Sequence, residues 1–463
     1  MTRFVARHKV LILICLLALV IRVAFFLALR PWDEATLKQA ILVQDAVGYD
    51  YLAHRIIDTG SYPSAETFRT PGYPMLVALM YFLFGGTPAA VLLLQILLDV
   101  GVVLLTYRLA REVFDSRTIG HVAAFLYAIS LLPPYFSTRL LTEIPFTAVF
   151  VLGILVFIRA LKTLGVWRFA LAGLILGVAT LIRPAAQLFP VVMAAVTLCR
   201  VREGRTKHAV LGAVALLAVF AVTISSWQLR NHRLYGYYAL SSIEGSNLCT
   251  WNVAMTEANA RGTTREEALK ELVGDSLDGI THPFEQGKVL NKIALEYIRT
   301  HPAEYAYCHM KGAANVFLGT AKGGVLRTFL PGWKGWEEDV PLAESTVARV
   351  TRLLRTAQSE YYLGPILATK QLIEYAFVVA ACVVVFYSRE RRLTVVFLVL
   401  GTLYFAGISG VIGHARYRVP AIPLYLTIAA KGMVEGFEFW KARRKKGGRG
   451  IRLPAENAPR AAS

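Results

Sequence analysis

The chain has 463 residues, of which 56% are hydrophobic and 17% are charged, and its mean hydropathy is +0.49. Soluble domains carry about 25% charged residues, so this composition excludes an ordinary soluble enzyme, and the apolar content excludes a disordered chain. Lysine and arginine number 50 against 31 acidic residues, for a net charge of +19, and in a membrane protein the location of these charges indicates orientation.

Ten apolar runs predict transmembrane helices, because about 20 apolar residues in a helix span the bilayer core and the shorter runs have interfacial ends. The first run, 10–29, follows basic residues and has no small-residue cleavage site after it, so we expect an uncleaved anchor. The other runs are 88–107, 118–134, 144–161, 169–182, 185–199, 209–228, 365–387, 393–412 and 419–439. A helix break is expected at Arg183-Pro184, since proline cannot continue a helix.

One further apolar run, 71–84, is too short to cross comfortably, since its length in a helix is about 21 Å. If this run lies in the outer interface instead, every inner segment is basic and both termini are cytoplasmic, as the positive-inside rule requires. If it crossed, that bias would reverse partway along the chain. The basic residues of the inner segments are Arg3, Arg7, Lys9, Arg108, Arg111, Arg117, Arg159, Lys162, Arg168, Arg200, Arg202, Arg205, Lys207, Arg389, Arg391 and Arg392.

The expected fold is therefore an all-α integral membrane protein with about ten transmembrane helices, outer juxtamembrane helices and a small extracytoplasmic domain. An N-terminal membrane module of seven spans covers 1–228, and its first outer loop, 31–87, contains the interfacial helix 71–84. The extracytoplasmic domain covers 229–364, with helices expected at 264–273 and 288–299. The last three spans fall within 365–440, and a basic cytoplasmic tail covers 441–463.

The basic tail predicts an electrostatic anchor to membrane lipids, and nucleic acid binding is the weaker interpretation, so no nucleic acid partner is expected. The predicted outer segments contain no N-x-S/T sequon, which fits a prokaryotic plasma (inner) membrane. Cys249 and Cys308 both lie in the predicted extracytoplasmic domain. A disulfide between them is one hypothesis, and two buried free thiols are the alternative. There is no CxxC motif and no zinc-type cysteine and histidine spacing.

Polar residues from six separate segments fall at the predicted outer face. Asp45, Tyr49 and Ala53 are four residues apart, so one helical face carries a carboxylate, an aromatic ring and a small residue. Asp50 and His54 lie in the same stretch. The other groups are Arg69 with Tyr73, Thr142 with Glu143, Arg183, Trp227 to Arg233 with Arg230 among them, and His414 to Arg418 with Arg416 among them.

This collection of carboxylates and arginines suits transfer of a group from a lipid phosphate. Arginines can hold an anionic head group through two hydrogen bonds and stabilise charge on a departing phosphate. A carboxylate beside them can accept a proton from an attacking hydroxyl. The alternative is that these arginines extend to ordinary lipid phosphates and that the acids cap helices.

At these residues the chain resembles the GT-C superfamily of membrane glycosyltransferases. It is most similar to the family-39-like group, which includes protein O-mannosyltransferases and the lipid A aminoarabinose transferase. The matching stretches, in order, are QDAVGYDYLAHRIIDTGSYP, FRTPGYPMLVALMYFLFG, LLTEIPF, GVATLIRPAA, SSWQLRNHRLYG, SIEGSNL and GHARYRVPAIPLY. The resemblance implies a polyprenyl-phosphate sugar donor and transfer of the sugar, with inversion, to a glycan, lipid or protein acceptor in the cell envelope.

The resemblance also implies roles for individual residues. Asp45 matches the first-loop acid that acts as general base or positions the acceptor, and Asp50 is the less favoured neighbour. Glu143 matches an acid of the second outer loop, and Arg183 matches a basic residue that contacts the lipid phosphate. The remaining expected phosphate contacts are Arg416, Arg418 and Arg69, and the expected substrate-lining residues are Tyr49, His54, Tyr73, Arg230 and His414.

Arg69 stands where the aminoarabinose transferase carries a metal-binding glutamate, so the resemblance does not imply a metal site here. We expect no required cofactor, and a divalent metal would have no clear ligand set. The alternatives to a transferase are a transporter or flippase for a polyprenyl-linked sugar, a polymerase or ligase of lipid-linked glycans, and a non-catalytic scaffold. Gln95 and Asp99 lie mid-membrane, far from the outer cluster, and are expected to make interhelical hydrogen bonds.

Overall fold

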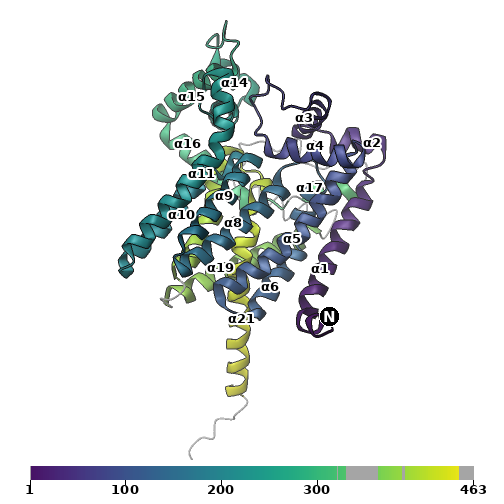
Figure 1. Ribbon diagram of the computed structural model, residues 1–463, viewed down its shortest axis with the longest axis vertical. Coiled ribbons are helices and arrows are strands. Elements are labelled where there is room, and N and C mark those ends of the chain that lie inside the picture. Colours follow the sequence, from purple (N-terminus) through teal and green to yellow (C-terminus); the bar gives the residue numbers. More distant parts are fainter. Residues whose placement is uncertain (1, 321, 330–362, 388–391, 448–463) are drawn as a thin grey trace, which may run out of the picture.

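The structure is a computed structural model that describes residues 2–320, 322–329, 363–387 and 392–447. Every regular element in these ranges is a helix, so the predicted all-α fold class is confirmed. Figure 1 shows long helices packed side by side, with a smaller group of helices at one end. Part of the predicted extracytoplasmic domain (330–362) and most of the basic tail lie outside the described residues.

The long helices match the predicted apolar runs closely. Among the residues that the structure describes, five segments are long and apolar enough to cross a membrane, and three shorter helices are also apolar. The ten-span count and the orientation stay predictions. The helices of the membrane module and the C-terminal part are α1 (Thr2–Leu29), α5 (Pro88–Phe114), α6 (Arg117–Ala128), α8 (Glu143–Thr163), α9 (Val166–Ile182), α10 (Phe189–Leu198), α11 (Thr206–Tyr235), α19 (Leu363–Tyr387), α20 (Arg392–Ile408) and α21 (Ile422–Gly447).

Prolines set two breaks in this bundle. The predicted break at Arg183-Pro184 is confirmed, since α9 ends at Ile182 and a single 3-10 turn, η2 (Pro184–Ala186), separates it from α10. The run 118–134, predicted as one helix, is divided instead, because α6 ends at Ala128 and α7 (Leu132–Ser137) begins anew. Pro133 and Pro134 occupy the first turn of α7, where their missing N–H groups are tolerated.

Two groups of helices lie at the same end of the molecule, opposite the start of α1 and the end of α21 (Figure 1). The first group is α3 (Asp45–Thr59) and α4 (Gly72–Phe84), so 71–84 is a helix as predicted, while its interfacial location stays a prediction. The second group includes α14 (Arg265–Val273), α15 (Pro283–Thr300) and α16 (Pro302–Leu318), which confirms the two helices predicted there. The α14 helix begins with a capping box between Thr264 and Glu267.

The bundle core is aromatic where α8, α10 and α20 meet. The Phe150 ring lies edge-on to Phe189 at 5.0 Å and to Phe405 at 5.1 Å. Close helix packing elsewhere depends on glycine, because a Cβ at Gly173 of α9 would lie 2.3 Å from the Leu216 carbonyl oxygen of α11. These contacts hold α8, α9 and α20 together in the bundle, and the start of α8 and the residue after α9 carry polar side chains discussed below.

A buried ion pair joins α1, α5 and α6. Arg22 Nε donates to Asp99 Oδ2 at 2.9 Å, and both side chains are fully buried. The Tyr127 hydroxyl donates to Asp99 Oδ1 at 2.7 Å, and Arg22 Nη1 donates to the Ala128 carbonyl at 2.7 Å. Gln95 likewise accepts from the Tyr73 hydroxyl at 2.9 Å. The predicted interhelical hydrogen-bonding role of Gln95 and Asp99 is therefore confirmed, and Arg22 is the partner that the sequence did not identify.

We expect Asp99→Asn to destabilise the protein by about 3–5 kcal/mol, because it leaves the Arg22 charge buried without a counter-ion. The measurement is thermal unfolding in detergent, followed by tryptophan fluorescence. The exposed i,i+4 pair Lys38–Glu34 provides the matched control, and Glu34→Gln should change stability by no more than about 0.5 kcal/mol. Equal melting temperatures for the two variants would contradict a structural role for the buried pair.

The two cysteines of the predicted extracytoplasmic domain are free and buried, so the disulfide hypothesis is wrong. Cys249 packs with Val253, Leu290 and Ala294, whereas Cys308 packs in a different cluster with Met255. Each thiol fills a separate apolar site, which agrees with the alternative hypothesis of two buried free thiols.

A thiol titration tests this arrangement. Denatured protein should show the same number of reactive thiols with and without prior reduction. In native protein Cys249 should react slowly at pH 8, because burial raises the pKa of its thiol to about 11 and little thiolate is present. If reduction increased the number of reactive thiols by two, the disulfide hypothesis would be correct after all.

Candidate functional site

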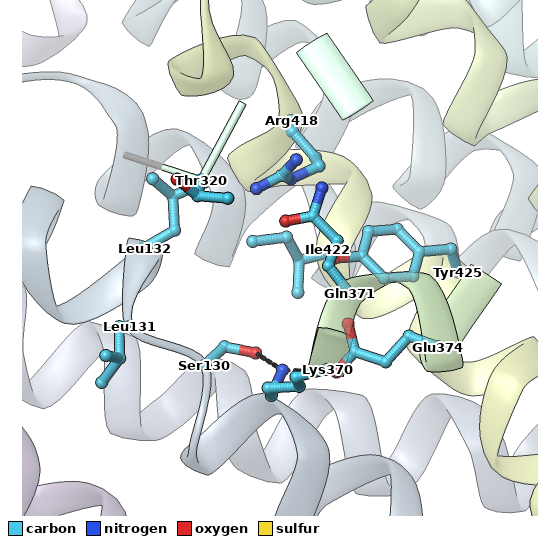
Figure 2. A pocket seen from close by; sticks show the side chains of 10 residues that line it. All are labelled: Ser130, Leu131, Leu132, Thr320, Lys370, Gln371, Glu374, Arg418, Ile422 and Tyr425. Carbon is cyan, nitrogen blue, oxygen red and sulfur yellow. Dashed lines mark hydrogen bonds and ion pairs between the residues drawn. The ribbon is translucent and has the colours of Figure 1, made fainter. Parts of the chain in front are cut away.

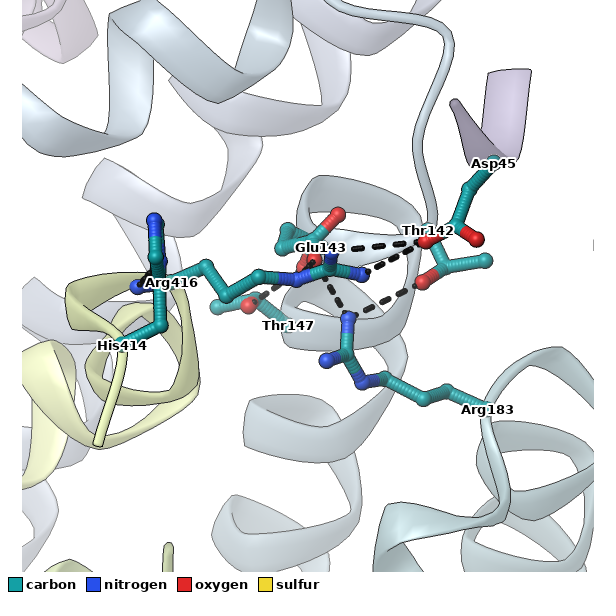
Figure 3. A network of polar contacts seen from close by, with 7 residues as sticks. All are labelled: Asp45, Thr142, Glu143, Thr147, Arg183, His414 and Arg416. Atoms are coloured by element: carbon teal, nitrogen blue, oxygen red, sulfur yellow. Dashed lines mark hydrogen bonds and ion pairs between the residues drawn. The ribbon is translucent and has the colours of Figure 1, made fainter. Parts of the chain in front are cut away.

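Four chain segments bring their polar side chains together in one network (Figure 3). Asp45 comes from the start of α3, Glu143 from the start of α8, and Arg183 from the residue after α9. Arg416 comes from the 3-10 helix η7 (Ala415–Ala421) between α20 and α21. We call these four residues, with Thr142, the outer cluster, after the side of the membrane that the sequence predicts for them.

Glu143 is the centre of the outer cluster, and its side chain is 1% exposed. Its Oε1 accepts from Arg183 Nη1 at 2.5 Å and from Arg416 Nε at 2.8 Å. Arg183 Nη1 also donates to Thr142 Oγ1 at 3.1 Å. The second carboxylate oxygen, Oε2, is buried and has no hydrogen-bond partner within the described part of the chain. One buried carboxylate therefore holds two guanidinium groups side by side.

Arg416 links this buried carboxylate to an accessible one. Its Nη1 and Nη2 each lie 3.3 Å from Asp45 Oδ2, while its Nε stays on Glu143. The Asp45 side chain is 43% exposed, in contrast to Glu143. The negative charge of Glu143 raises the pKa of Arg416, so this guanidinium stays charged at every physiological pH.

Helix ends explain why these residues meet. Asp45 lies in the first turn of α3, directly after Gln44, whose φ of 51° separates α3 from the preceding turn. Arg183 is extended and ends α9, since Pro184 disfavours a helical residue before it. His414 precedes η7, and its Nδ1 accepts the Arg416 backbone N–H at 3.0 Å. Burial lowers the pKa of His414, which favours the neutral ring that can accept this bond.

Arg69 adds a third positive charge beside the cluster. Its guanidinium lies 5.0 Å from the Tyr49 ring centroid, and its Nη2 is 3.5 Å from the Asp45 carbonyl oxygen. A Cβ at Gly48 would lie 2.4 Å from this guanidinium, so only glycine leaves room for it there. No carboxylate among the described residues lies within ion-pair distance of Arg69. Burial raises the pKa of Tyr49, so its phenol remains a proton donor beside Asp45.

Asp50, His54 and Tyr73 do not join the outer cluster. Asp50 accepts from the Tyr81 hydroxyl at 2.6 Å, and His54 Nε2 lies 3.8 Å from the same Asp50 oxygen. Tyr73 donates to Gln95 and meets Tyr49 edge to face at 4.8 Å. Asp45 and Asp50 thus have different partners, and of these two only Asp45 contacts arginine.

Arg418 and Arg230 hold backbone carbonyls instead of contacting the cluster. Arg418 is buried, and its Nη1 donates to the carbonyls of Val316 at 2.9 Å and Phe317 at 2.7 Å, at the end of α16. Arg230 donates to the Pro63 carbonyl at 2.6 Å and to the Glu66 carbonyl at 3.0 Å. Among the predicted phosphate contacts, the structure therefore brings together Arg183, Arg416 and Arg69.

Thr142 of the outer cluster and the neighbouring Tyr417 were not among the predicted catalytic, phosphate-binding or substrate-lining residues. Thr142 accepts a hydrogen bond from Arg183, and the ring of Tyr417 lies 5.4 Å from the Arg183 guanidinium and 5.9 Å from that of Arg416. Tyr417 provides an aromatic face to both cations. Its position between two arginines in the sequence was the signal that could have identified it.

The described residues contain no group of three or more histidine, cysteine, aspartate or glutamate side chains that could hold a metal. A separate cavity of about 30 Å³ lies beside Arg418, with Ser130, Lys370 and Glu374 in its lining (Figure 2). Lys370 contacts Glu374 and Ser130 there. A cavity of this volume holds about one or two water molecules. It is too small for a sugar or a lipid, so the outer cluster is the candidate site.

Residues 68–227 match the family model for dolichyl-phosphate-mannose-protein mannosyltransferases. The matched segment contains Arg69, Glu143 and Arg183. The fold of the whole chain is similar to that of oligosaccharyltransferase AglB from Archaeoglobus fulgidus, solved in complex with an inhibitory peptide and a dolichol-phosphate. The TM-score is 0.52 at 16% identity, over 95% of this chain and 52% of that chain. The predicted resemblance to GT-C glycosyltransferases is confirmed.

A second solved structure, the Archaeoglobus fulgidus oligosaccharyltransferase tethered with an acceptor peptide, gives a TM-score of 0.53 at 17% identity, over 97% of this chain and 52% of that chain. The chain thus spans about half the length of these two oligosaccharyltransferase chains. ArnT from Cupriavidus metallidurans bound to undecaprenyl phosphate gives a TM-score of 0.40 at 14% identity, over 97% of this chain and 82% of that chain. No curated protein matches the chain.

Proposed function

We propose that this protein transfers a sugar from a polyprenyl-phosphate donor to an acceptor hydroxyl at the extracytoplasmic face of a membrane. The observation that carries the proposal is the outer cluster, in which one buried carboxylate holds two arginines against a second, accessible carboxylate. The match to the mannosyltransferase family model over residues 68–227 supports it. So does the dolichol-phosphate in the structure of the archaeal protein with a similar fold.

The cluster divides into a part for phosphate and a part for the proton. Arg183 and Arg416, with Arg69 beside them, supply the positive charge that would hold the donor phosphate and stabilise it as it departs. Glu143 is buried under both guanidiniums, so its role is to hold them in place rather than to accept a proton. Asp45 is the accessible carboxylate and acts as the general base.

Donor binding would also release the base. Without donor, both Nη groups of Arg416 donate to Asp45, and its Nε donates to Glu143. A donor phosphate competes for the Nη groups and leaves the Asp45 carboxylate free. The acceptor oxygen then attacks the anomeric carbon, its proton passes to Asp45, and the carbon–oxygen bond to phosphate breaks with the electron pair leaving on the phosphate oxygen. A single displacement of this kind inverts the anomeric carbon.

The surface of α4 supports a location at the membrane interface. Met75, Leu79, Phe82 and Leu83 are each more than half exposed, and their spacing places them on one face of the helix. We propose that this face lies in the outer interface of a prokaryotic inner membrane, with both termini cytoplasmic. The segment 229–364 would then be extracytoplasmic and contribute to the choice of acceptor.

The test is turnover of a panel of short-chain polyprenyl-phosphate sugars by purified protein in detergent, with candidate glycan, lipid and peptide acceptors. Release of polyprenyl phosphate that depends on both donor and acceptor would establish the transferase. Activity only with a lipid-linked oligosaccharide would identify a glycan ligase or polymerase instead. Donor movement across proteoliposome membranes without release would identify a flippase. No binding to any donor would overturn the proposal.

A further inference from the structure

The loop that carries Arg416 is held by helices of the outer segment. This loop runs from the end of α20, at Ile408, through the short 3-10 turn η6 (Gly410–Ile412) into η7. Gly410 and Gly413 have φ values of 62° and 57°, so the backbone adopts a conformation there that favours glycine. The loop therefore has little intrinsic preference for one position, and its neighbours must fix it.

The first contact comes from Asn252 in the π-helix η4 (Leu248–Val253). Its side-chain Oδ1 accepts the Val411 backbone N–H at 2.7 Å, and its Nδ2 donates to the Asn247 carbonyl at 3.1 Å. A Cβ at Gly410 would lie 1.8 Å from Asn252 Oδ1, so the amide rests directly against the loop backbone. Neither bond contributes to the outer cluster itself.

The second contact comes from α16, which approaches the loop through glycine. A Cβ at Gly312 would lie 2.2 Å from the Gly410 carbonyl oxygen and 2.8 Å from that of Val411. A Cβ at Gly413 would lie 2.4 Å from the Gly312 carbonyl oxygen. Beyond Arg416, Arg418 donates to carbonyls at the end of α16. The backbone on both sides of Arg416 is thus attached to one helix.

We propose that Asn252 and Gly312 are positioning residues that fix the Arg416 guanidinium between Glu143 and Asp45. The inference rests on the proposed function, because it concerns the site at which the donor phosphate would bind. Arg416 bonds Glu143 and Asp45 at once, and an arginine held at two points loses one of them when its backbone moves. The segment proposed to select the acceptor therefore also sets the geometry for the donor.

The first experiment compares two glycine-to-alanine variants in helices. Gly312→Ala places a methyl group against the loop, whereas Gly407→Ala in α20 meets nothing within 4 Å. Alanine has a higher helix propensity than glycine, so helix propensity alone predicts that both variants fold. We expect Gly312→Ala to lower kcat/KM for the donor about 10- to 100-fold and to raise donor KM, since displacements near 1 Å have effects of this size. Gly407→Ala should match wild type.

The second experiment removes the amide. Asn252→Ala should lower donor kcat/KM about 10-fold and raise donor KM, which loss of folded protein alone cannot do. Asn252→Asp keeps the acceptor for Val411 N–H and should recover most of this loss. Thr250→Val, on the same π-helix, is the matched control and should resemble wild type.

Hydrogen exchange of the peptide 409–418 separates this inference from the proposed function. Asn252→Ala should accelerate exchange in that peptide, with or without turnover, because the Val411 amide loses its partner. Unchanged exchange, or unchanged donor KM in both Gly312→Ala and Asn252→Ala, would overturn the positioning role. A wild-type protein that is inactive on every donor, with accelerated exchange in the variant, would overturn the proposed function and leave the attachment of the loop established.

Discussion

Asp45→Asn is expected to reduce donor-dependent release of polyprenyl phosphate by about 100-fold or more, because general bases typically contribute rate factors of 10²–10⁴. The asparagine keeps the size of the side chain and an oxygen that can accept from Arg416, so the fold and donor binding should be retained. The effect should therefore appear in kcat, with donor affinity near that of wild type. The measurement is steady-state turnover beside equilibrium donor binding on the same preparation.

Asp50→Asn is the matched control for this change, since both aspartates are on α3 and differ in their partners. Asp50 contacts Tyr81 and His54, so its variant should keep most of the activity. The opposite pattern, an inactive Asp50 variant and an active Asp45 variant, would make Asp50 the base. Full activity in both would leave proton transfer to another group and remove the role proposed for the accessible carboxylate.

Local rules predicted some helix boundaries and missed others, since the run 118–134 is divided between α6 and α7. Pro184 ends α9 and the capping box at Thr264 begins α14, and both are readable because they depend on neighbouring residues alone. Contacts between residues far apart in the chain were harder to predict from the sequence. Asp99 was identified as a polar residue at membrane depth, but its partner Arg22 is 77 positions away in the chain, and no local pattern connects them.

The charged residues on the predicted outer side include most of the outer cluster, but the sequence did not show which arginines contact the two carboxylates. Asp45, Glu143, Arg183 and Arg416 all lie at helix ends on the predicted outer side, so a common location was predictable. Arg416 and Arg418 are only two residues apart, and both were predicted to contact phosphate. In a 3-10 helix of three residues per turn they point in different directions, so one joins the cluster and the other holds α16.

The partner of Asn252 could not be predicted from the sequence either. An asparagine in a polar segment suggests a turn or a cap, and its actual partner lies 159 positions away. The contact depends on close packing of η4 and α16 against η6, and such packing is decided by tertiary structure. Residues that attach a site to its surroundings are therefore harder to predict than the charged residues within it.

Arg416→Ala is expected to affect both stability and activity. Glu143 would keep Arg183 as its counter-ion, so the loss of stability should be smaller than the ~3–5 kcal/mol that an uncompensated buried charge costs. Turnover should fall about 100-fold or more, because the departing phosphate loses a cation placed to stabilise it. Thermal unfolding in detergent measures the first effect, and turnover below the melting temperature measures the second.

Arg416→Lys separates charge from geometry. Lysine keeps the positive charge beside Glu143, so it should recover part of the lost stability. A single ammonium cannot reproduce three nitrogen contacts to two carboxylates, so turnover should stay close to that of the alanine variant. Recovery of turnover by lysine would mean that a positive charge alone suffices, and the planar guanidinium would have no special role. Wild-type turnover in Arg416→Ala would instead assign phosphate binding to Arg183 and Arg69, and the contact with Asp45 would serve structure alone.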